Sequence, residues 1–448
     1  MSLKTIDRIA ISDGNRDFIQ SDYYDYSYFE AKNIIDKTSE QLLMSGKKGD
    51  IVIIKDSSPV NQLFYFLSSW KAGLISVILS PNISEENYNR IIKKIEPKII
   101  IDGVIKQYIE YKGNIEKDSN YFLGALSSGT TGEEKLIWRS YNSWKRAFQH
   151  QSKIFNIKQG YRLLLNGSFH FSANLNSALH IFFEGGTVVH TNKQKPTEIM
   201  NLIDKKDVDA IFMVPARYNI LTTYNTRQSL KIRSVVSAGS KIDICTLRKL
   251  KEIFPNASIV EYYGASELGH VSYLTYEDSL AKEGSVGRAF PEVQIAIENK
   301  RIWVKSPYIA DGFPSIYSVG DMGYLDEDDF LFLTGREGNI INKAGEKIMA
   351  EEIEKVLIRH PNVNEAAVIG KVHDIKGEEI MAFISINKST NEAKIKNEIK
   401  QLCKQYLEYT KIPKDIVIIN NIPRNENGKI DRKILKQYWS QETGSFFI

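Results

Sequence analysis

Short apolar runs alternate with longer amphipathic segments over most of this chain. Amphipathic patterns that fit helices include Asn61–Trp70, Asn174–Phe183 and Ile242–Ile253. The apolar runs, which we expect to be buried strands, are Ile51–Ile54, Leu74–Leu79, Ile99–Ile101, Leu163–Leu165, Thr187–Val189, Ala210–Val214, Ser234–Ser237 and Ser258–Val260. This alternation is typical of α/β layering with mostly parallel sheets. The sequence therefore predicts a large α/β body in which helices cover the sheets.

The pattern changes after about residue 290, where hairpin-like strands predict a distorted barrel-like β region. These strands are Val293–Ile297, Arg301–Val304, Tyr324–Leu325 and Phe330–Phe332. Residues 335–345 are rich in glycine and charge, which favours a domain boundary. A compact α+β pattern follows, made of helix Ala350–Arg359, strands Val363–Gly370 and Ile380–Ile386, helix Glu392–Leu407 and strand Asp415–Ile419. We expect a body of residues 1–336 and a small C-terminal lid of residues 337–448.

Composition excludes several classes of protein. With 42% hydrophobic and 25% charged residues, the chain resembles an ordinary globular protein. Its net charge of +4 is small and no basic block dominates, so nucleic-acid binding has little support. Two cysteines cannot form a disulfide framework, which favours the cytoplasm. The most apolar stretch, Leu63–Leu79, is interrupted by Lys71 and Gly73 and is too short to span a bilayer.

One loop after an apolar run carries an unusual density of anion-binding groups. It contains Ser127, Ser128, Gly129, Thr130, Thr131, Gly132 and Lys135. Glycines let backbone N–H groups converge on an anion, while hydroxyls add donors and lysine adds charge. The common nucleotide-binding loop needs a lysine where Thr130 stands, so kinase or GTPase chemistry is disfavoured. The loop is either a binding site for the polyphosphate of ATP or an ordinary polar turn.

Three further segments place chemically useful side chains in loops. Glu267 follows the strand Ser258–Val260 and offers the oxygen ligand that Mg²⁺ prefers, while Ser266 beside it can donate to a phosphate. Asp321 follows a glycine in a tight turn and can accept two ribose hydroxyls, although a turn-forming role is more common. Lys429 lies in a basic segment, 423–432, which taken alone would be a solvated loop.

Taken together, these motifs resemble the adenylate-forming superfamily of acyl- and aryl-CoA synthetases, nonribosomal peptide adenylation domains and luciferases. The loop resembles [ST]-S-G-T-T-G-x-P-K, with Glu134 in place of the proline. Residues 263–267 are similar to Y-G-x-[ST]-E, 317–321 to Y-x-x-G-D and 423–432 to P-x-x-x-x-G-K-I-x-R. Residues 335–354 resemble the family's long hinge motif. The resemblance covers about residues 25 to 435, with five motifs in the family's order.

The resemblance implies an acid–thiol ligase that forms an acyl adenylate from a carboxylic acid and Mg²⁺-ATP, releases pyrophosphate and transfers the acyl group to coenzyme A, as in fatty acid metabolism. The catalytic residues would be Lys429, Glu267 and Ser266, with Glu267 also the metal ligand. Groups binding ATP would be the loop residues Ser127, Ser128, Gly129, Thr130, Thr131, Gly132 and Lys135, the adenine neighbours Ala238, Gly239, Tyr262, Tyr263 and Gly264, and the ribose ligands Asp321 and Arg336. Gly338 would be the hinge, where Asp or Lys is usual, and Gly345 would line the thiol tunnel.

The resemblance also bears on the acid and the acceptor. Amino-acid-activating members carry an aspartate that the segment Phe169–Ser172 lacks, and a buried unpaired ammonium costs several kcal/mol, so a fatty or aromatic acid is favoured. His170 is either an aromatic gate of the acyl pocket or a core histidine. Segment Asn342–Ile348 resembles G-G-E-x-I of CoA ligases. The alternatives are a stand-alone adenylation enzyme that loads a separate carrier protein, and a non-catalytic nucleotide-binding homologue.

Overall fold

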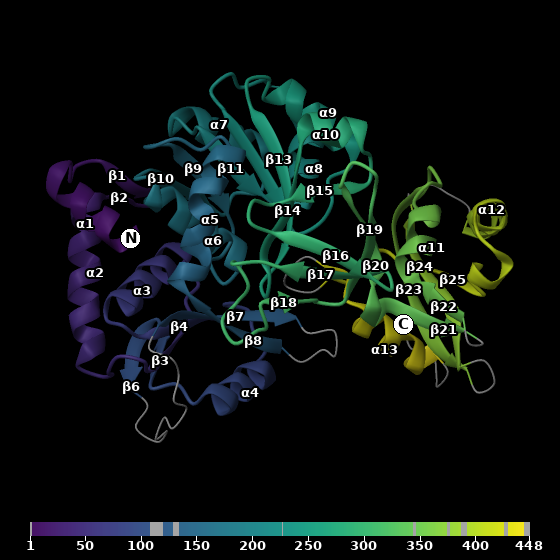
Figure 1. Ribbon diagram of the computed structural model, residues 1–448, viewed down its shortest axis with the longest axis horizontal. Helices are drawn as coiled ribbons and strands as arrows, with labels where there is room; N and C mark the ends of the chain where they lie inside the picture. Colours follow the sequence, from purple (N-terminus) through teal and green to yellow (C-terminus); the bar gives the residue numbers. More distant parts are fainter. Residues whose placement is uncertain are drawn as a thin grey trace.

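Three β-sheets with flanking helices make up the structure, a computed structural model (Figure 1). The described residues are 2–107, 120–128, 134–225, 227–343, 346–373, 377–386, 392–424 and 429–442. Two of the sheets form a broad body and the third forms a smaller lid, on the right in Figure 1, which adjoins the body near β20. The expected large α/β body and small α+β lid are therefore confirmed.

The first body sheet has six strands in the order β6-β5-β3-β4-β7-β8. Its inner strands are parallel, and β6 and β8 pair antiparallel at the edges. Every residue of β3 and β4 is buried, as expected for parallel strands covered on both faces. The elements are β3 (Ile51–Ile54), α3 (Pro59–Lys71), β4 (Ile75–Ile78), α4 (Glu85–Ile95), β5 (Ile99–Asp102), β6 (Val104–Gln107), β7 (Tyr121–Ser128) and β8 (Glu134–Ser140).

The second body sheet is larger and begins with parallel strands. Strands β1, β10, β9, β11, β12 and β13 lie side by side in that order and run parallel, with β2 antiparallel at the outer edge. The elements are β1 (Asp17–Gln20), β2 (Asp25–Ser27), α5 (Tyr141–Ile154), β9 (Arg162–Asn166), α6 (Ser172–Phe183), β10 (Thr187–Thr191), α7 (Pro196–Lys205), β11 (Ala210–Met213), α8 (Pro215–Tyr224), β12 (Ser234–Ala238), α9 (Ile244–Ile253) and β13 (Ser258–Ala265).

The N-terminal segment completes this second sheet, a pairing that the sequence patterns did not indicate. Helices α1 (Ser2–Ser12) and α2 (Tyr28–Leu43) flank the short strands β1 and β2. Ser27 and Glu30 form a reciprocal capping box that starts α2. The fully buried Tyr28 hydroxyl donates to the Gly186 carbonyl at 2.6 Å, which fastens α2 to the loop before β10.

Beyond β13 the large sheet becomes antiparallel. The expected barrel-like region is formed by β14 (Gly269–Thr275), β15 (Ser285–Ala289), β16 (Gln294–Glu298), β17 (Arg301–Lys305), β18 (Ile316–Tyr317), β19 (Asp321–Leu325) and β20 (Leu331–Arg336), with α10 (Tyr276–Ala281) after β14. These strands continue the sheet in the order β14-β15-β20-β19-β17-β16, and over the described strands they do not close into a barrel. Position 287 needs glycine here, because an added Cβ would lie 1.8 Å from the Tyr273 carbonyl oxygen and φ is +97°.

The lid has its own sheet and two small cores. Its strands are β21 (Ile340–Lys343), β22 (Glu346–Met349), β23 (Val363–His373), β24 (Gly377–Ile386) and β25 (Asp415–Ile418), and its helices are α11 (Ala350–Leu357), α12 (Glu392–Tyr406) and α13 (Arg432–Glu442). Successive residues of β23 point into opposite cores. Val368 packs with α11 and α12, and Ile369 packs with Leu435 of α13. In the described parts of the chain, no helix has the length and apolar character needed to cross a membrane.

Gly287→Ala should destabilise the body, because it combines left-handed backbone strain, worth about 1–3 kcal/mol, with a backbone clash. Gly312→Ala is the matched control: its φ is +83°, but nothing lies within 4 Å of the added Cβ. Urea unfolding followed by tryptophan fluorescence should give a lower midpoint for the 287 variant than for the 312 variant. Equal midpoints would contradict the close packing at position 287.

Candidate active site

The predicted phosphate-binding segment joins two antiparallel strands. Ser127 and Ser128 end β7, and Lys135 pairs with Ser127 across β8. Lys135 is exposed to solvent. The remaining predicted loop residues, Gly129, Thr130, Thr131 and Gly132, lie outside the described residues, as does the predicted tunnel residue Gly345. The structure therefore describes the two strands that flank the loop. The roles of the residues at its tip remain predictions.

Ser266 and Glu267 lie in the turn between β13 and β14. Ser266 Oγ is 3.3 Å from Ser172 Oγ at the start of α6. The backbone N–H of Ala310 donates to the Glu267 carbonyl at 2.8 Å. Contacts from Ser172 and Ala310, which belong to two distant segments, thus hold the turn that carries the Ser266 and Glu267 side chains.

The predicted adenine neighbours lie at the carboxyl ends of two parallel strands. Ala238 ends β12 opposite Tyr262 of β13, and Gly239 follows directly. Successive strand side chains point to opposite faces. Accordingly, the Tyr262 ring packs 4.5 Å from the His270 ring, while the Tyr263 hydroxyl reaches Asp321. The predicted residue Gly264 also lies in β13, where an added Cβ would be 2.3 Å from the Gly269 carbonyl oxygen.

Asp321 and Arg336 face each other across β19 and β20. The Tyr263 hydroxyl donates to Asp321 Oδ2, and Arg336 Nε lies 3.4 Å from Oδ1. Burial, and then the negative charge of Asp321, raise the pKa of Tyr263 well above its usual value, so its hydroxyl stays protonated. The structure therefore brings together three residues that the sequence analysis had assigned to nucleotide binding.

Lys429 is the lid residue that lies near this cluster. It is exposed to solvent, yet the protein around its ammonium desolvates it and lowers its pKa, and Arg336 lowers that pKa further. Asp321 and Glu267 act in the opposite direction and raise the pKa of Lys429. The lid lysine therefore lies within electrostatic reach of the predicted ribose ligands and of the predicted metal ligand.

A relay of hydrogen bonds fixes the orientation of His170. The Ser168 hydroxyl donates to Gln62 Oε1 at 2.6 Å, so its oxygen accepts from His170 Nδ1 at 2.7 Å. His170 Nε2 is buried and has no hydrogen-bond partner within the described part of the chain. Burial lowers the pKa of His170 to about 4, so the ring is neutral near pH 7. The space that it lines with Ile78, Leu123, Gly124, Ala125, Phe169, Ser172 and Leu175 is too tight for a water molecule.

Gly338 lies between the body and the lid, in a short 3₁₀ turn, Glu337–Asn339. On the body side, Glu337 forms an ion pair with Arg301 at 2.8 Å. On the lid side, the Asn339 amide donates to Glu351. The φ of Gly338 is not in the left-handed region. Both neighbours of the predicted hinge are therefore anchored, one to each domain.

Sequence analysis did not single out Arg139, although it contacts the turn that carries Ser266. Its side chain is only 1% exposed and donates to the Ser266 carbonyl from Nε and Nη2. The available signal was an arginine directly after the apolar strand segment Leu136–Trp138, two positions after the buried Ile137. Because Arg is rarely fully buried without a partner, such a position is noticeable only once burial is known.

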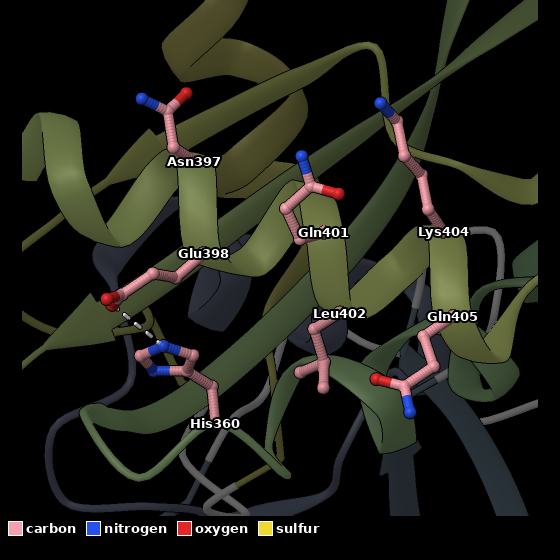
Figure 2. A pocket seen from close by; sticks show the side chains of 7 residues that line it. All are labelled: His360, Asn397, Glu398, Gln401, Leu402, Lys404 and Gln405. Atoms are coloured by element: carbon pink, nitrogen blue, oxygen red, sulfur yellow. Dashed lines mark hydrogen bonds and ion pairs between the residues drawn. The ribbon is translucent and has the colours of Figure 1, made fainter.

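A hollow on the lid's outer surface lies apart from these residues (Figure 2). It is lined by His360, Asn397, Glu398, Gln401, Leu402, Lys404 and Gln405, mostly from α12, which lies on the side of the lid away from the body in Figure 1. In neutral His360, Nδ1 accepts from the Asn362 N–H, so Nε2 donates to Glu398 at 3.3 Å. Since this histidine is already satisfied and no predicted site residue lines the hollow, we do not assign the active site to it.

Comparison with known sequences identifies the family. Residues 110–313 match the AMP-binding enzyme family, and residues 352–429 match the AMP-binding enzyme C-terminal domain. The uncharacterized acyl-CoA ligase YhfT of Bacillus subtilis is 30% identical over 376 residues, covering 79% of this chain and 77% of that protein. The 2-succinylbenzoate–CoA ligase of Listeria monocytogenes is 30% identical over 328 residues, covering 69% and 68%. The chain belongs to the AMP-binding enzyme family, and the predicted membership of the adenylate-forming superfamily is confirmed.

Solved structures agree at the level of the fold. The o-succinylbenzoate CoA synthetase MenE from Bacillus subtilis, solved with the acyl-adenylate intermediate OSB-AMP, has a TM-score of 0.84 at 21% identity, covering 96% of this chain and 97% of that chain. ATP-bound MatB from Rhodopseudomonas palustris has a TM-score of 0.84 at 20% identity, covering 99% and 100%. These likenesses support the two-part architecture of a large body and a small C-terminal domain.

Proposed function

We propose that this protein activates a fatty or aromatic carboxylic acid as an acyl adenylate, with release of pyrophosphate, and then transfers the acyl group to the thiol of coenzyme A. The convergence of Lys429 with Arg336, Asp321 and Glu267 carries this proposal. These residues come from the lid and from three separate body segments. A cation placed beside two carboxylates and an arginine suits a site where a carboxylate and a phosphate must meet.

Each part of the site takes a role in adenylation under this proposal. Ser127, Ser128, Gly129, Thr130, Thr131, Gly132 and Lys135 hold the β- and γ-phosphates, Ser266 contacts the α-phosphate, and Asp321 and Arg336 bind the ribose. Ala238, Gly239 and Tyr262 to Gly264 flank the adenine. Lys429 bridges the substrate carboxylate and the α-phosphate. Catalysis then consists chiefly of positioning and charge neutralisation.

Glu267 fits a magnesium ion that is carried on ATP. Mg²⁺ usually keeps several waters and binds through one or two protein carboxylates together with substrate phosphates. Over the described residues there is no cluster of three or more His, Cys, Asp or Glu side chains suited to a metal. A single half-buried carboxylate beside the phosphate-binding hairpin agrees with a metal that depends on the nucleotide for its other ligands. The ion would neutralise phosphate charge when bound.

The surroundings of His170 support an acid without an amino group. Apolar side chains, including Leu123, Ala125 and Leu175, line the tight space beside its ring. No carboxylate lines that space among the described residues, so an ammonium would be unpaired. Because the space is too tight for a water molecule, a lining side chain has to move to admit an acyl chain, and we assign that movement to His170 as the gate. Aromatic and fatty acids both satisfy these constraints.

A panel of fatty, aromatic and amino acids, scored for AMP release with and without coenzyme A, tests the proposal. Release that requires both a non-amino acid and coenzyme A is the expected result. Acid-dependent pyrophosphate exchange without coenzyme A turnover would favour the alternative acceptor, a separate carrier protein. Absence of exchange with every acid would favour a non-catalytic nucleotide-binding homologue.

Lys429→Ala should lower acid-dependent pyrophosphate exchange at least about 10²-fold, the loss typical of one preorganised charge. Lys436→Ala, which removes an exposed lysine from the adjacent helix α13, is the matched control and should retain wild-type exchange. Transfer from a supplied acyl adenylate to coenzyme A should survive in both variants, because Lys429 is needed only in the first step. Near wild-type exchange in the Lys429 variant would refute its assignment.

Gly338→Pro should spare adenylation and impair thioester formation, because proline fixes φ near −65° and restricts a lid rotation between the two steps. Gly338→Ala is the control, since alanine leaves φ adjustable within the ordinary region and should support both steps. Single-turnover measurements of each half-reaction give the two rates. A proline variant that loses both equally would show that position 338 supports the fold and is not a hinge.

A further inference from the structure

A fully buried arginine joins the two body sheets next to the active site. Arg139 lies in β8, four residues after Lys135, and its side chain is 1% exposed. In the described part of the chain no carboxylate lies within ion-pair distance of its guanidinium. Burial lowers its pKa to about 10, so the group remains a cation near neutral pH. The negative charges of Asp311 and Glu267 favour its charged form from beyond ion-pair distance, and without a direct ion pair a buried cation is costly.

Its donors bind backbone carbonyls from two other segments. Nε and Nη2 converge on the Ser266 carbonyl oxygen at 3.1 and 2.5 Å. Nη1 donates to the Tyr308 carbonyl at 2.5 Å and lies 3.3 Å from Ser143 Oγ. The planar fork of arginine can hold both carbonyls at once, whereas an ammonium is a single point of charge. Arg139 thus ties β8 to the turn that carries Ser266 and to the loop at Tyr308.

Neighbouring contacts close the same three segments into one unit. The Asp311 carboxylate accepts from the backbone N–H of Ser140 at 2.5 Å, and Asp311 N–H donates to the Trp138 carbonyl at 3.1 Å. Ala310 N–H donates to the Glu267 carbonyl at 2.8 Å. Strand β8 belongs to the six-stranded sheet, while Glu267 belongs to a turn of the large sheet. The connection between the two sheets at this point is therefore made by the side chains of Arg139 and Asp311 and by loop backbone.

We propose that Arg139 is a positioning residue of the adenylation site, which holds the Ser266–Glu267 turn in fixed relation to the phosphate-binding hairpin β7–β8. This inference rests on the proposed function of those two segments. Glu267 presents its carboxylate to the metal of Mg²⁺-ATP only if the turn keeps its distance from the hairpin that binds the phosphates. The buried charge of Arg139 also attracts anions at the site, since it is weakly screened there.

Two variants separate the geometric effect of Arg139 from its charge. Arg139→Lys keeps a positive charge and loses the planar guanidinium. Arg139→Met removes both the charge and the guanidinium and keeps an unbranched side chain. Tyr28→Phe is the matched control, because Tyr28 is also fully buried and its hydroxyl donates to a backbone carbonyl, that of Gly186, outside the proposed site. Thermal melting identifies the temperature range in which all three variants are folded.

Calorimetric titration of ATP, with and without Mg²⁺, measures the gain in ATP affinity that the metal provides. A purely structural role of Arg139 would leave that gain unchanged. In Arg139→Lys we expect the gain in ATP affinity on adding Mg²⁺ to fall about tenfold, the equivalent of one lost charge-assisted contact, with little change in affinity without the metal. Arg139→Met should weaken ATP binding in both conditions. In both variants kcat for pyrophosphate exchange should fall at least about tenfold, as expected for misplaced catalytic groups.

A folded Arg139→Lys variant with the wild-type response to Mg²⁺ would overturn the inference, as would an equal loss in the Tyr28→Phe control. Failure of the proposed function is a different outcome, namely a wild-type protein that supports no exchange with any acid. In that case the Mg²⁺-dependent gain in ATP affinity still decides whether Arg139 positions the turn.

Discussion

Two anions, a carboxylate and a polyphosphate, have to approach each other in the proposed reaction, and the site depends on cations held where they meet. The cations come from separate parts of the chain. Lys135 lies on the hairpin of the six-stranded sheet, Arg336 at the end of strand β20 in the large sheet and Lys429 in the lid. Arg139 adds a charge that is buried behind the Ser266–Glu267 turn. The carboxylates of Glu267 and Asp321 lie near Lys429 and offset its repulsion from Arg336.

The two body sheets supply different halves of this arrangement. Parallel strands of the large sheet end at Ala238 and at the β13–β14 turn, which follows the rule that α/β sheets bind ligands beyond the carboxyl ends of their strands. The six-stranded sheet supplies the β7–β8 hairpin. Since no strand ladder joins the two sheets at this point among the described strands, side chains and loop backbone have to set the distance between them. In the proposed site, a small displacement there would separate the phosphates from Glu267, the proposed metal ligand.

Local patterns in the sequence predicted the strands that are marked by a short apolar run. Strand Ile51–Ile54 has the bounds that its apolar run predicted, and Ala210–Val214 differs from the observed strand by one residue. The short strand Asp17–Gln20 escaped prediction because its position beside β10 is decided by a partner far along the chain. The tautomer of His170 likewise depends on Gln62, more than a hundred positions earlier, and the burial of Arg139 on carbonyls of two distant segments. Motif spacing therefore indicated candidate residues for the site, while the contacts that orient them needed the structure.

At the predicted hinge, where the chain departs from the family's pattern, neighbouring residues contact both domains. Gly338 has no side chain to favour one lid position, and its neighbours hold the two domains instead. The Arg301–Glu337 pair is largely exposed, with side-chain exposures of 35% and 53%, and exposed pairs contribute about 0–1 kcal/mol. A pair this weak leaves the position of the lid to other contacts between lid and body, among them the hydrogen bond from Lys355 Nζ to the Leu333 carbonyl at 3.3 Å. Under the proposed function, an anion bound between Lys429 and the body would add to these contacts, so that a bound nucleotide would favour this position of the lid.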